Sequence, residues 1–198
     1  MRLFDCTLIA ITIVSSDHPT DFTERQLTTR LVYDGRLLKV REDTVRLPDG
    51  KTAHREYVEH PGAVMIVAMP DEKTVLLERQ FRYAPRRHFL ELPAGKIEMG
   101  ETPLKTAQRE LIEECGYQAT KWQHLTSLYS CIGYSNELIE FYLARGLTHV
   151  GSALDDGEFL EVVAVSLDEA LKLVRSGDIT DIKTVAGLAW VGMYDYPT

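Results

Sequence analysis

Three glutamates crowd one short stretch of the sequence, "RELIEECGY" at residues 109–117. In a helix, Glu110, Glu113 and Glu114 lie on nearly one face, because side chains three and four positions apart are neighbours. Arg109 can pair with Glu113, which leaves Glu110 and Glu114 without a partner on the helix. Clustered carboxylates are ligands for hard divalent cations such as Mg²⁺, which commonly bridge them to substrate phosphates. The stretch therefore indicates metal-assisted phosphate chemistry, and a solvated acidic face is the alternative.

The sequence also predicts where this helix begins and ends. Thr102 suits the N-cap, Pro103 the first helical position and Gly116 the left-handed position after the last turn. An apolar stripe at helical spacing should face the core and consists of Leu104, Ala107 and Leu111. The preceding segment, "LPAGKIEMGE", is typical of a strand end followed by a tight loop. A backbone carbonyl exposed at that turn could complete an all-oxygen coordination sphere.

The N-terminal part of the chain reads as short β-strands. From about residue 27 to 60, apolar segments are separated by turn residues, and Asp34-Gly35 predicts a hairpin turn in which both residues need positive φ. Such a meander is marginal alone, so we expect it to lean on the rest of the chain or on a second copy. We assign residues 1–60 to an N-terminal β-sheet region, of which 1–26 is a strand or a loose leader.

Strands and helices mix in the remainder, residues 61–198. Two buried-type strands are predicted at 63–69 and 74–81, and further strands near 125–131, 138–145 and 159–166. Ser166 with Glu169 forms a capping box for a helix that Gly177 ends, and a last helix begins at Thr180 or Asp181. This order indicates α/β or α+β architecture without regular βαβ alternation.

Composition limits the class of protein. The 198 residues are 44% hydrophobic and 26% charged, which fits a globular chain. The net charge of −8 argues against nucleic acid and anionic membranes as partners. The apolar run at residues 8–14 is too short to span a bilayer. Three widely spaced cysteines, Cys6, Cys115 and Cys131, suggest neither a disulfide framework nor a zinc site and fit a reducing cytoplasm.

One longer pattern resembles a known family. Gly95, five residues, Glu101, seven residues and then the stretch 109–117 match the Nudix hydrolase signature at its fixed charged and glycine positions, with Tyr117 where an aliphatic residue is commoner. The resemblance implies a Nudix fold, an α/β/α sandwich around a mixed sheet, here with an added N-terminal antiparallel sheet. It also implies Mg²⁺-dependent hydrolysis of a nucleoside diphosphate linked to another group.

Segments outside the signature look like the ADP-ribose pyrophosphatase branch, namely "REYVEHPGAV", "LLERQFRY", "ELPAGKIEMGE" and "DITDIKT". Proteins of this branch form homodimers in which the partners complete each other's nucleotide pocket. One departure is Ile132, which stands where the branch carries a proline, although Gly133 and Glu137 remain in place. ADP-ribose is therefore the favoured substrate, and a related nucleotide sugar such as GDP-mannose stays open.

Residue roles follow from the resemblance. It implies that two or three Mg²⁺ ions, for which Mn²⁺ can substitute, bind Glu110, Glu113, Glu114 and the carbonyl of Ala94. Arg109 orients Glu113 and the loop, and both residues belong to the catalytic set. Three further positions serve the structure of the motif: Gly95, Glu101 and Gly116.

The general base and the substrate contacts lie outside the signature. The acidic segment "ALDDGEFLEVV" supplies Asp155, Asp156 and Glu158, of which Glu158 aligns best as the base, and a solvated acidic turn is nearly as good an interpretation. Five positions are candidates for contacting the phosphates, the nucleoside or the ribose, with a surface role as the alternative: Arg55, Arg82, Glu137, Glu56 and Tyr83.

Two other functions remain as alternatives. A Nudix fold can bind a nucleotide without cleaving it, but the intact "REXXEE" pattern argues against a sensor that has no need of clustered carboxylates. A decapping or 8-oxo-nucleoside triphosphate hydrolase would use the same signature, and the N-terminal sheet and the "QFR" segment argue against it.

Overall fold

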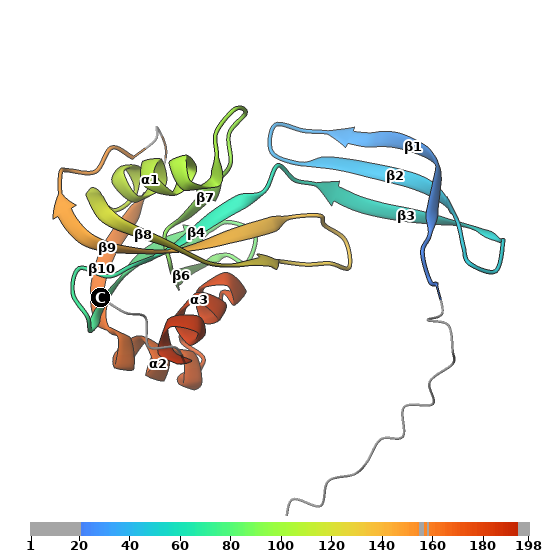
Figure 1. Ribbon diagram of the computed structural model, residues 1–198. Coiled ribbons are helices and arrows are strands. Elements are labelled where there is room, and N and C mark those ends of the chain that lie inside the picture. The colour runs from blue at the N-terminus through green and yellow to red at the C-terminus, as the bar shows by residue number, and fades with distance from the viewer. Residues whose placement is uncertain (1–20, 155–156, 158, 194–198) are drawn as a thin grey trace, which may run out of the picture.

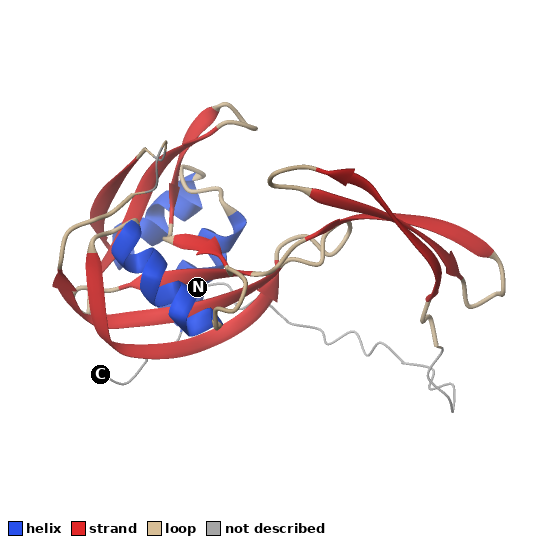
Figure 2. Cartoon of the chain, turned by 90° about the horizontal axis from the view of Figure 1, so that it is seen from above, coloured by secondary structure: helices blue, strands red, loops and turns tan. Residues whose placement is uncertain are grey.

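The computed structural model describes residues 21–154, 157 and 159–193. Its first part is a three-stranded antiparallel sheet in the order β1-β2-β3 (Figure 1). The strands are β1 (Arg25–Asp34), β2 (Lys39–Arg46) and β3 (Thr52–Glu59). This sheet extends away from the rest of the molecule, as the view from above also shows (Figure 2). The expected N-terminal antiparallel sheet is confirmed.

The turn between β1 and β2 differs from the prediction. Neither Asp34 nor Gly35 has positive φ. Strands β1 and β2 instead pair as far as Asp34 and Lys39, so residues 35–38 connect them, and the N–H of Gly35 donates to the carbonyl of Leu38 at 2.9 Å. The ring of Tyr33 lies over Gly35, so that a Cβ at position 35 would lie 2.5 Å from it and the exposed ring would have to move.

The second part contains the remaining strands in two sheets. A mixed sheet has the order β7-β4-β9-β8, with β4 parallel to β9, and a smaller antiparallel sheet has the order β10-β5-β6. The strands are β4 (Ala63–Ala68), β5 (Thr74–Arg82), β6 (Arg87–Glu91), β7 (Ala94–Lys96), β8 (Tyr117–Tyr129), β9 (Leu138–His149) and β10 (Leu160–Ser166). The strand predicted near 125–131 thus begins earlier, because β8 pairs with β9 from Tyr117 onward.

Strand β4 is buried on both faces and separates two apolar clusters. Val64 and Ile66 pack with α1 (Pro103–Glu113), whereas Met65 and Val67 pack with α2 (Leu167–Ser176) and α3 (Ile182–Met193). Alternate residues of a strand point to opposite faces, so one apolar strand serves both layers. Figure 1 shows α1 on one side of the sheet and α2 and α3 on the other. The expected α/β/α sandwich is confirmed.

The predicted ends of α1 and α2 agree with the structure. The Thr102 side chain accepts from the N–H of Lys105, and Gly116 has a φ of 74°. Ser166 caps α2, which ends at the left-handed Gly177. The apolar stripe of α1 is wrong at Leu104, which is 38% exposed, because the buried arc is centred between Thr106 and Leu111 and leaves position 104 at its margin.

No helix among the described residues combines the length and the apolar character needed to cross a membrane.

Candidate active site

Arg109 of α1 contacts three glutamates, namely Glu101, Glu110 and Glu113. One terminal nitrogen donates to Glu110 Oε1 at 2.9 Å and to Glu113 Oε2 at 2.8 Å. The Nε and the other terminal nitrogen donate to the two oxygens of Glu101 at 3.1 and 3.0 Å. The predicted pair with Glu113 is therefore confirmed, and the expectation that Glu110 lacked a partner is wrong, because one guanidinium has enough N–H groups for all three carboxylates.

Glu101 fixes Arg109 to the first turn of α1. The Thr106 hydroxyl donates to the same carboxylate at 2.8 Å. The Arg109 guanidinium, helped by this hydroxyl, lowers the pKa of Glu101 to about 2. The same partner raises the pKa of Arg109 further above its already high value, so both groups stay charged at neutral pH.

The backbone of β7 lies directly against the carboxylates of α1. The N–H of Ala94 donates to Glu114 Oε2 at 3.0 Å, so Glu114 also has a partner that the sequence did not predict. A Cβ at Gly95 would lie 1.8 Å from Glu110 Oε1, so only glycine lets this carboxylate approach the strand. Glu110 and Glu114 are buried. Buried charges need partners, and these contacts provide them.

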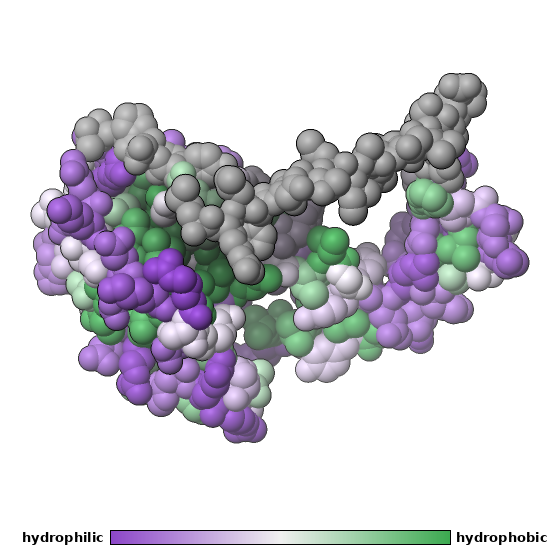
Figure 3. Space-filling model, turned by 90° about the horizontal axis from the view of Figure 1, so that it is seen from below, coloured by the Kyte–Doolittle hydropathy of each residue, from purple (hydrophilic) through white to green (hydrophobic). Residues whose placement is uncertain are grey.

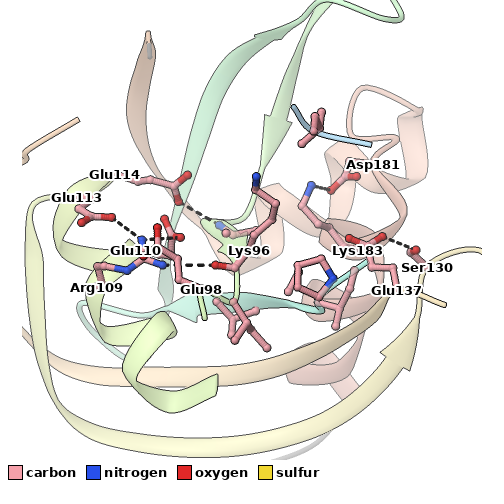
Figure 4. A pocket seen from close by; sticks show the side chains of 18 of the residues that line it. Lys96, Glu98, Arg109, Glu110, Glu113, Glu114, Ser130, Glu137, Asp181 and Lys183 are labelled. Carbon is pink, nitrogen blue, oxygen red and sulfur yellow. Dashed lines mark hydrogen bonds and ion pairs between the residues drawn. The ribbon is translucent and has the colours of Figure 1, made fainter. Parts of the chain in front are cut away.

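A cavity of about 1070 Å³ opens in front of these carboxylates. Figure 4 shows Arg109, Glu110, Glu113 and Glu114 on one side of it. Four other polar residues line the opposite side, namely Ser130, Glu137, Asp181 and Lys183. The cavity also reaches the β1–β2 turn, whose Arg36 and Leu37 line it. An anionic ligand in this cavity would therefore meet cations, such as Lys183, and carboxylates that could share a metal ion with it.

Comparison with known proteins agrees with this arrangement. Residues 59–186 match the NUDIX domain family, and residues 24–58 match the nucleoside diphosphate sugar hydrolase N-terminal domain. The chain belongs to the Nudix family. This Nudix chain is 38% identical to a "Methanol dehydrogenase activator" of Bacillus methanolicus (88% of this chain, 95% of the relative). It is 39% identical to an "ADP-ribose pyrophosphatase" of Bacillus subtilis strain 168 (85% and 92%).

A solved structure resembles the fold of this Nudix protein over most of its length. The structure of an "ADP compounds hydrolase" superposes with a TM-score of 0.78 at 24% sequence identity, covering 88% of this chain and 96% of that one. The Nudix domain and the relatives indicate a pyrophosphohydrolase.

Lys183 lines the cavity of this Nudix protein but was not predicted as a site residue from the sequence. Lys183 Nζ donates to Glu91 Oε2 at 2.5 Å and to Asp181 Oδ2 at 2.8 Å. Arg82, a predicted phosphate-binding residue, lines the cavity and donates to Glu91 through two nitrogens at 2.7 and 2.9 Å. The signal was the "DITDIKT" segment, because a helix that begins after Asp181 places Lys183 in its first turn.

Buried hydrogen bonds fix this first turn of α3. Asp181 Oδ2 accepts from the N–H and the hydroxyl of Thr184 at 3.1 and 2.7 Å. Thr184 Oγ1 in turn accepts from the N–H of Leu92 at 2.8 Å. Since Leu92 precedes Ala94 by two residues, this bond holds the start of α3 close to strand β7.

Glu137 lies at the junction with the N-terminal sheet. It accepts from the Ser130 hydroxyl at 2.5 Å and lies 3.5 Å from His60 Nε2. The loop before it pairs with the end of β3, where the N–H of Val58 donates to the Tyr134 carbonyl at 2.8 Å. This predicted substrate contact therefore lines the cavity and is tied to the strand that leads into the N-terminal sheet.

Several predicted residues lie elsewhere. Arg55 and Glu56 are exposed on β3, outside the lining of the cavity, and Arg55 pairs with Glu24. Tyr83 packs under Arg86 at 3.5 Å and lines a smaller cavity of about 390 Å³. Three candidates for the base, Asp155, Asp156 and Glu158, lie outside the described residues.

The carboxylates fit a hard divalent cation by type. Three carboxylates and the β7 backbone meet on one wall, and oxygen donors are what Mg²⁺ prefers. Among the described residues, no three acidic, histidine or cysteine side chains already surround a common point. The reason is visible in the contacts, since Arg109 holds Glu110 and Glu113 while Ala94 holds Glu114. A cation would share these carboxylates with Arg109 or take them over.

Proposed function

We propose that this Nudix enzyme hydrolyses the pyrophosphate bond of ADP-ribose, or of a related nucleoside diphosphate sugar, to a nucleoside monophosphate and a sugar phosphate. The observation that carries the proposal is one cavity lined both by the buried carboxylates Glu110 and Glu114 and by the cations Arg82 and Lys183. A diphosphate accompanied by a metal ion is the ligand whose charges suit both kinds of lining residue. The ADP-ribose pyrophosphatase of Bacillus subtilis supports the adenine nucleotide as first choice.

The metal in this proposal is Mg²⁺, as two or three ions, with Mn²⁺ able to substitute. Glu110, Glu113, Glu114 and the Ala94 carbonyl would hold it. Bound there, it would neutralise the diphosphate, polarise the phosphorus and lower the pKa of a water molecule. Arg109 keeps two of the carboxylates together before the ion arrives.

The protein must also accept the proton of the attacking water. We assign this task to Glu158 because of its position after the signature. A carboxylate can act as the general base when it lies within hydrogen-bonding distance of the water. Replacing Glu158 by Gln should lower the rate and leave metal affinity nearly unchanged. A wild-type rate in that variant would move the role to another acid.

The N-terminal sheet suggests a homodimer. Every residue of β1 is exposed, and the exposed large apolar residues of β1 and the turn after it are Leu27, Leu31, Val32, Tyr33, Leu37 and Leu38. Figure 3 shows such apolar side chains among polar ones on the sheet. In such a dimer, Arg55 and Glu56 of one chain could reach the cavity of the other chain. They could then contact the substrate there, although they do not line the cavity of their own chain. The boundary between the two parts would lie near residue 60.

The cysteines favour a cytoplasmic location in this proposal. Cys115 and Cys131 are both free thiols. Cys115 is buried and donates to Glu78 Oε1 at 3.2 Å. Burial raises the pKa of the Cys115 thiol, so it stays protonated and unreactive. A reducing compartment suits such cysteines.

The test is a panel of nucleotide sugars, including ADP-ribose and GDP-mannose, incubated with Mg²⁺ or Mn²⁺ and analysed for products by chromatography. We expect AMP and ribose phosphate from ADP-ribose, and no product when EDTA is added. Preference for another nucleotide sugar would reassign the substrate. Ile132, which is exposed in the β8–β9 loop and stands where the ADP-ribose branch carries a proline, leaves this outcome open. Tight nucleotide binding without any product would identify a binding module instead.

A further inference from the structure

Glu91 is a buried carboxylate that the proposed chemistry does not use. It ends β6 and is 3% exposed. A charge in such a position is unfavourable unless it is paired and hydrogen-bonded. Burial alone raises the pKa of Glu91, but Arg82 and Lys183 outweigh it and hold the pKa below its usual range. The carboxylate is therefore ionised, and its place in the site calls for an explanation.

Both partners of Glu91 are cations that face the large cavity. Arg82 donates to Oε1 and Oε2 at 2.7 and 2.9 Å, and Lys183 donates to Oε2 at 2.5 Å. Because they share Oε2, the two positive groups lie next to each other. Arg82 and Lys183 line both the large and the small cavity, whereas Glu91 lines only the small one. Glu91 thus lies outside the lining of the large cavity and contacts two of the cations that line it.

The two cations are more exposed than the carboxylate that they share. The Glu91 side chain is 4% exposed, that of Lys183 is 16% exposed and that of Arg82 is 45% exposed. Among the described residues, the hydrogen bonds of Arg82 all go to Glu91. A guanidinium that binds a carboxylate through one edge keeps N–H groups on its other edge for a second anion.

From this geometry we propose that Glu91 is a positioning residue. Its carboxylate holds Arg82 and Lys183 side by side in the lining of the large cavity, where the two cations bind the diphosphate of the substrate. The inference rests on the proposed function, since it assigns a role in binding the same diphosphate. Without Glu91, the two like charges would repel each other. Arginine and lysine are also flexible, so fixing them before binding lowers the entropy that the substrate complex must lose.

The first experiment compares Glu91→Gln with a matched variant, Glu78→Gln. Glu78 is the antiparallel pairing partner of Glu91 on β5, is equally buried and does not line either cavity. We expect Glu91→Gln to raise KM for ADP-ribose by about 30-fold or more, as for one member of a buried charge pair. We expect kcat to stay within about threefold, because a contact made equally in ground and transition states affects KM alone. Glu78→Gln should change neither parameter.

A second experiment separates positioning from general stability. If Glu91 acts through the two cations, its replacement should matter little once both are neutral. In the background Arg82→Gln with Lys183→Gln, adding Glu91→Gln should therefore change KM by less than about twofold. This triple variant leaves no uncompensated charge at the three positions, so it is expected to fold even if Glu91→Gln alone unfolds. A thermal unfolding curve of each variant verifies the folded state.

A binding measurement keeps the inference independent of turnover. Calorimetric titration with ADP and Mg²⁺ should give a Kd about 30-fold weaker for Glu91→Gln than for wild type. Equal affinities, equal losses in Glu91→Gln and Glu78→Gln, or a full additional loss in the triple variant would each overturn the positioning role. A wild-type protein that binds ADP in this way but cleaves no nucleotide sugar would overturn the proposed function and leave the positioning role standing.

Discussion

Among single residues, Glu114 is the one whose removal should separate chemistry from folding. Its carboxylate is buried and accepts from the N–H of Ala94, a residue whose carbonyl is another predicted metal ligand. Glu114→Gln keeps the size of the side chain and an oxygen that can accept from Ala94. We expect kcat to fall about 100-fold or more, since even residues that only support metal ligands commonly contribute 10- to 100-fold, while the unfolding temperature changes little.

Glu161→Gln is the control for this substitution, because Glu161 lies on β10, is exposed and pairs only loosely with Arg79 at 3.9 Å. Full activity in Glu114→Gln, with metal affinity unchanged in a Mn²⁺ titration, would contradict the metal role.

Ionisation of Glu101 should make the stability of the protein depend on pH. Its pKa is about 2 in the folded protein against an ordinary value of 4.5, because Arg109 and Thr106 favour the ionised form. A lowered pKa in the folded state stabilises the protein above the unfolded pKa, and this stabilisation is lost as the pH falls through the folded pKa. Wild type should therefore exceed Glu101→Gln in free energy of unfolding above pH 4.5, and the difference should vanish between pH 4.5 and about 2.

Urea unfolding at a series of pH values measures this difference. Glu161→Gln again serves as the control and should show a smaller dependence on pH. A difference between wild type and Glu101→Gln that persists unchanged down to pH 2 would contradict the assigned cause.

At the scale of elements, the docking of α3 fixes the position of Lys183 in the lining of the cavity. Thr184 is fully buried and joins the first turn of α3 to Leu92. Thr184→Val has nearly the same shape but leaves the N–H of Leu92 without this acceptor. We expect the free energy of unfolding to fall by about 1–3 kcal/mol, the usual effect of an unsatisfied buried polar group. KM should also rise, because Lys183 lies in the same turn.

Thr184→Ser is the matched control, since it keeps the hydroxyl and removes only a methyl group. It should lose about 0.5–1.5 kcal/mol, with KM unchanged. A valine variant with the stability and the KM of wild type would show that the docking of α3 does not depend on this hydrogen bond.

The same elements show what the sequence could predict. The α1 carboxylates, Thr102 and Gly116 were predictable because helix spacing and capping are local patterns. The contact of Lys183 with Glu91 joins positions 92 residues apart, and no local pattern reports it. The β1–β2 turn shows the reverse case. Asp34-Gly35 is a sound local turn signal, but β1 and β2 pair as far as Asp34 and Lys39, so the turn lies at residues 35–38.

The exposed N-terminal sheet is the main feature at the scale of the whole molecule. Only Val45 of its apolar residues is buried, whereas the other part has a core on both faces of β4. Three strands with this little burial are marginal in water. The sheet contacts the rest of the chain through the end of β3 and through Arg36 and Leu37 at the cavity. A second copy would bury the remaining apolar surface and bring its own Arg55 near the first cavity.

Leu31 tests this assembly, because it is an exposed apolar residue in the middle of β1. In analytical ultracentrifugation at micromolar concentration, we expect wild type to sediment with twice the mass of one chain and Leu31→Glu to sediment mainly as a monomer. A glutamate in an apolar interface loses its hydration without gaining a partner, and it adds to a net charge that is already −8 per chain.

The monomer should retain the metal site but lose affinity for the nucleotide, so kcat/KM should fall about tenfold or more, in line with the loss of one charged contact. Val150→Glu, an exposed apolar position after β9 and outside the sheet, should leave both mass and activity unchanged. A monomeric wild type with full activity would instead mean that one chain completes its own pocket, and Arg55 and Glu56 would then have no part in binding the substrate.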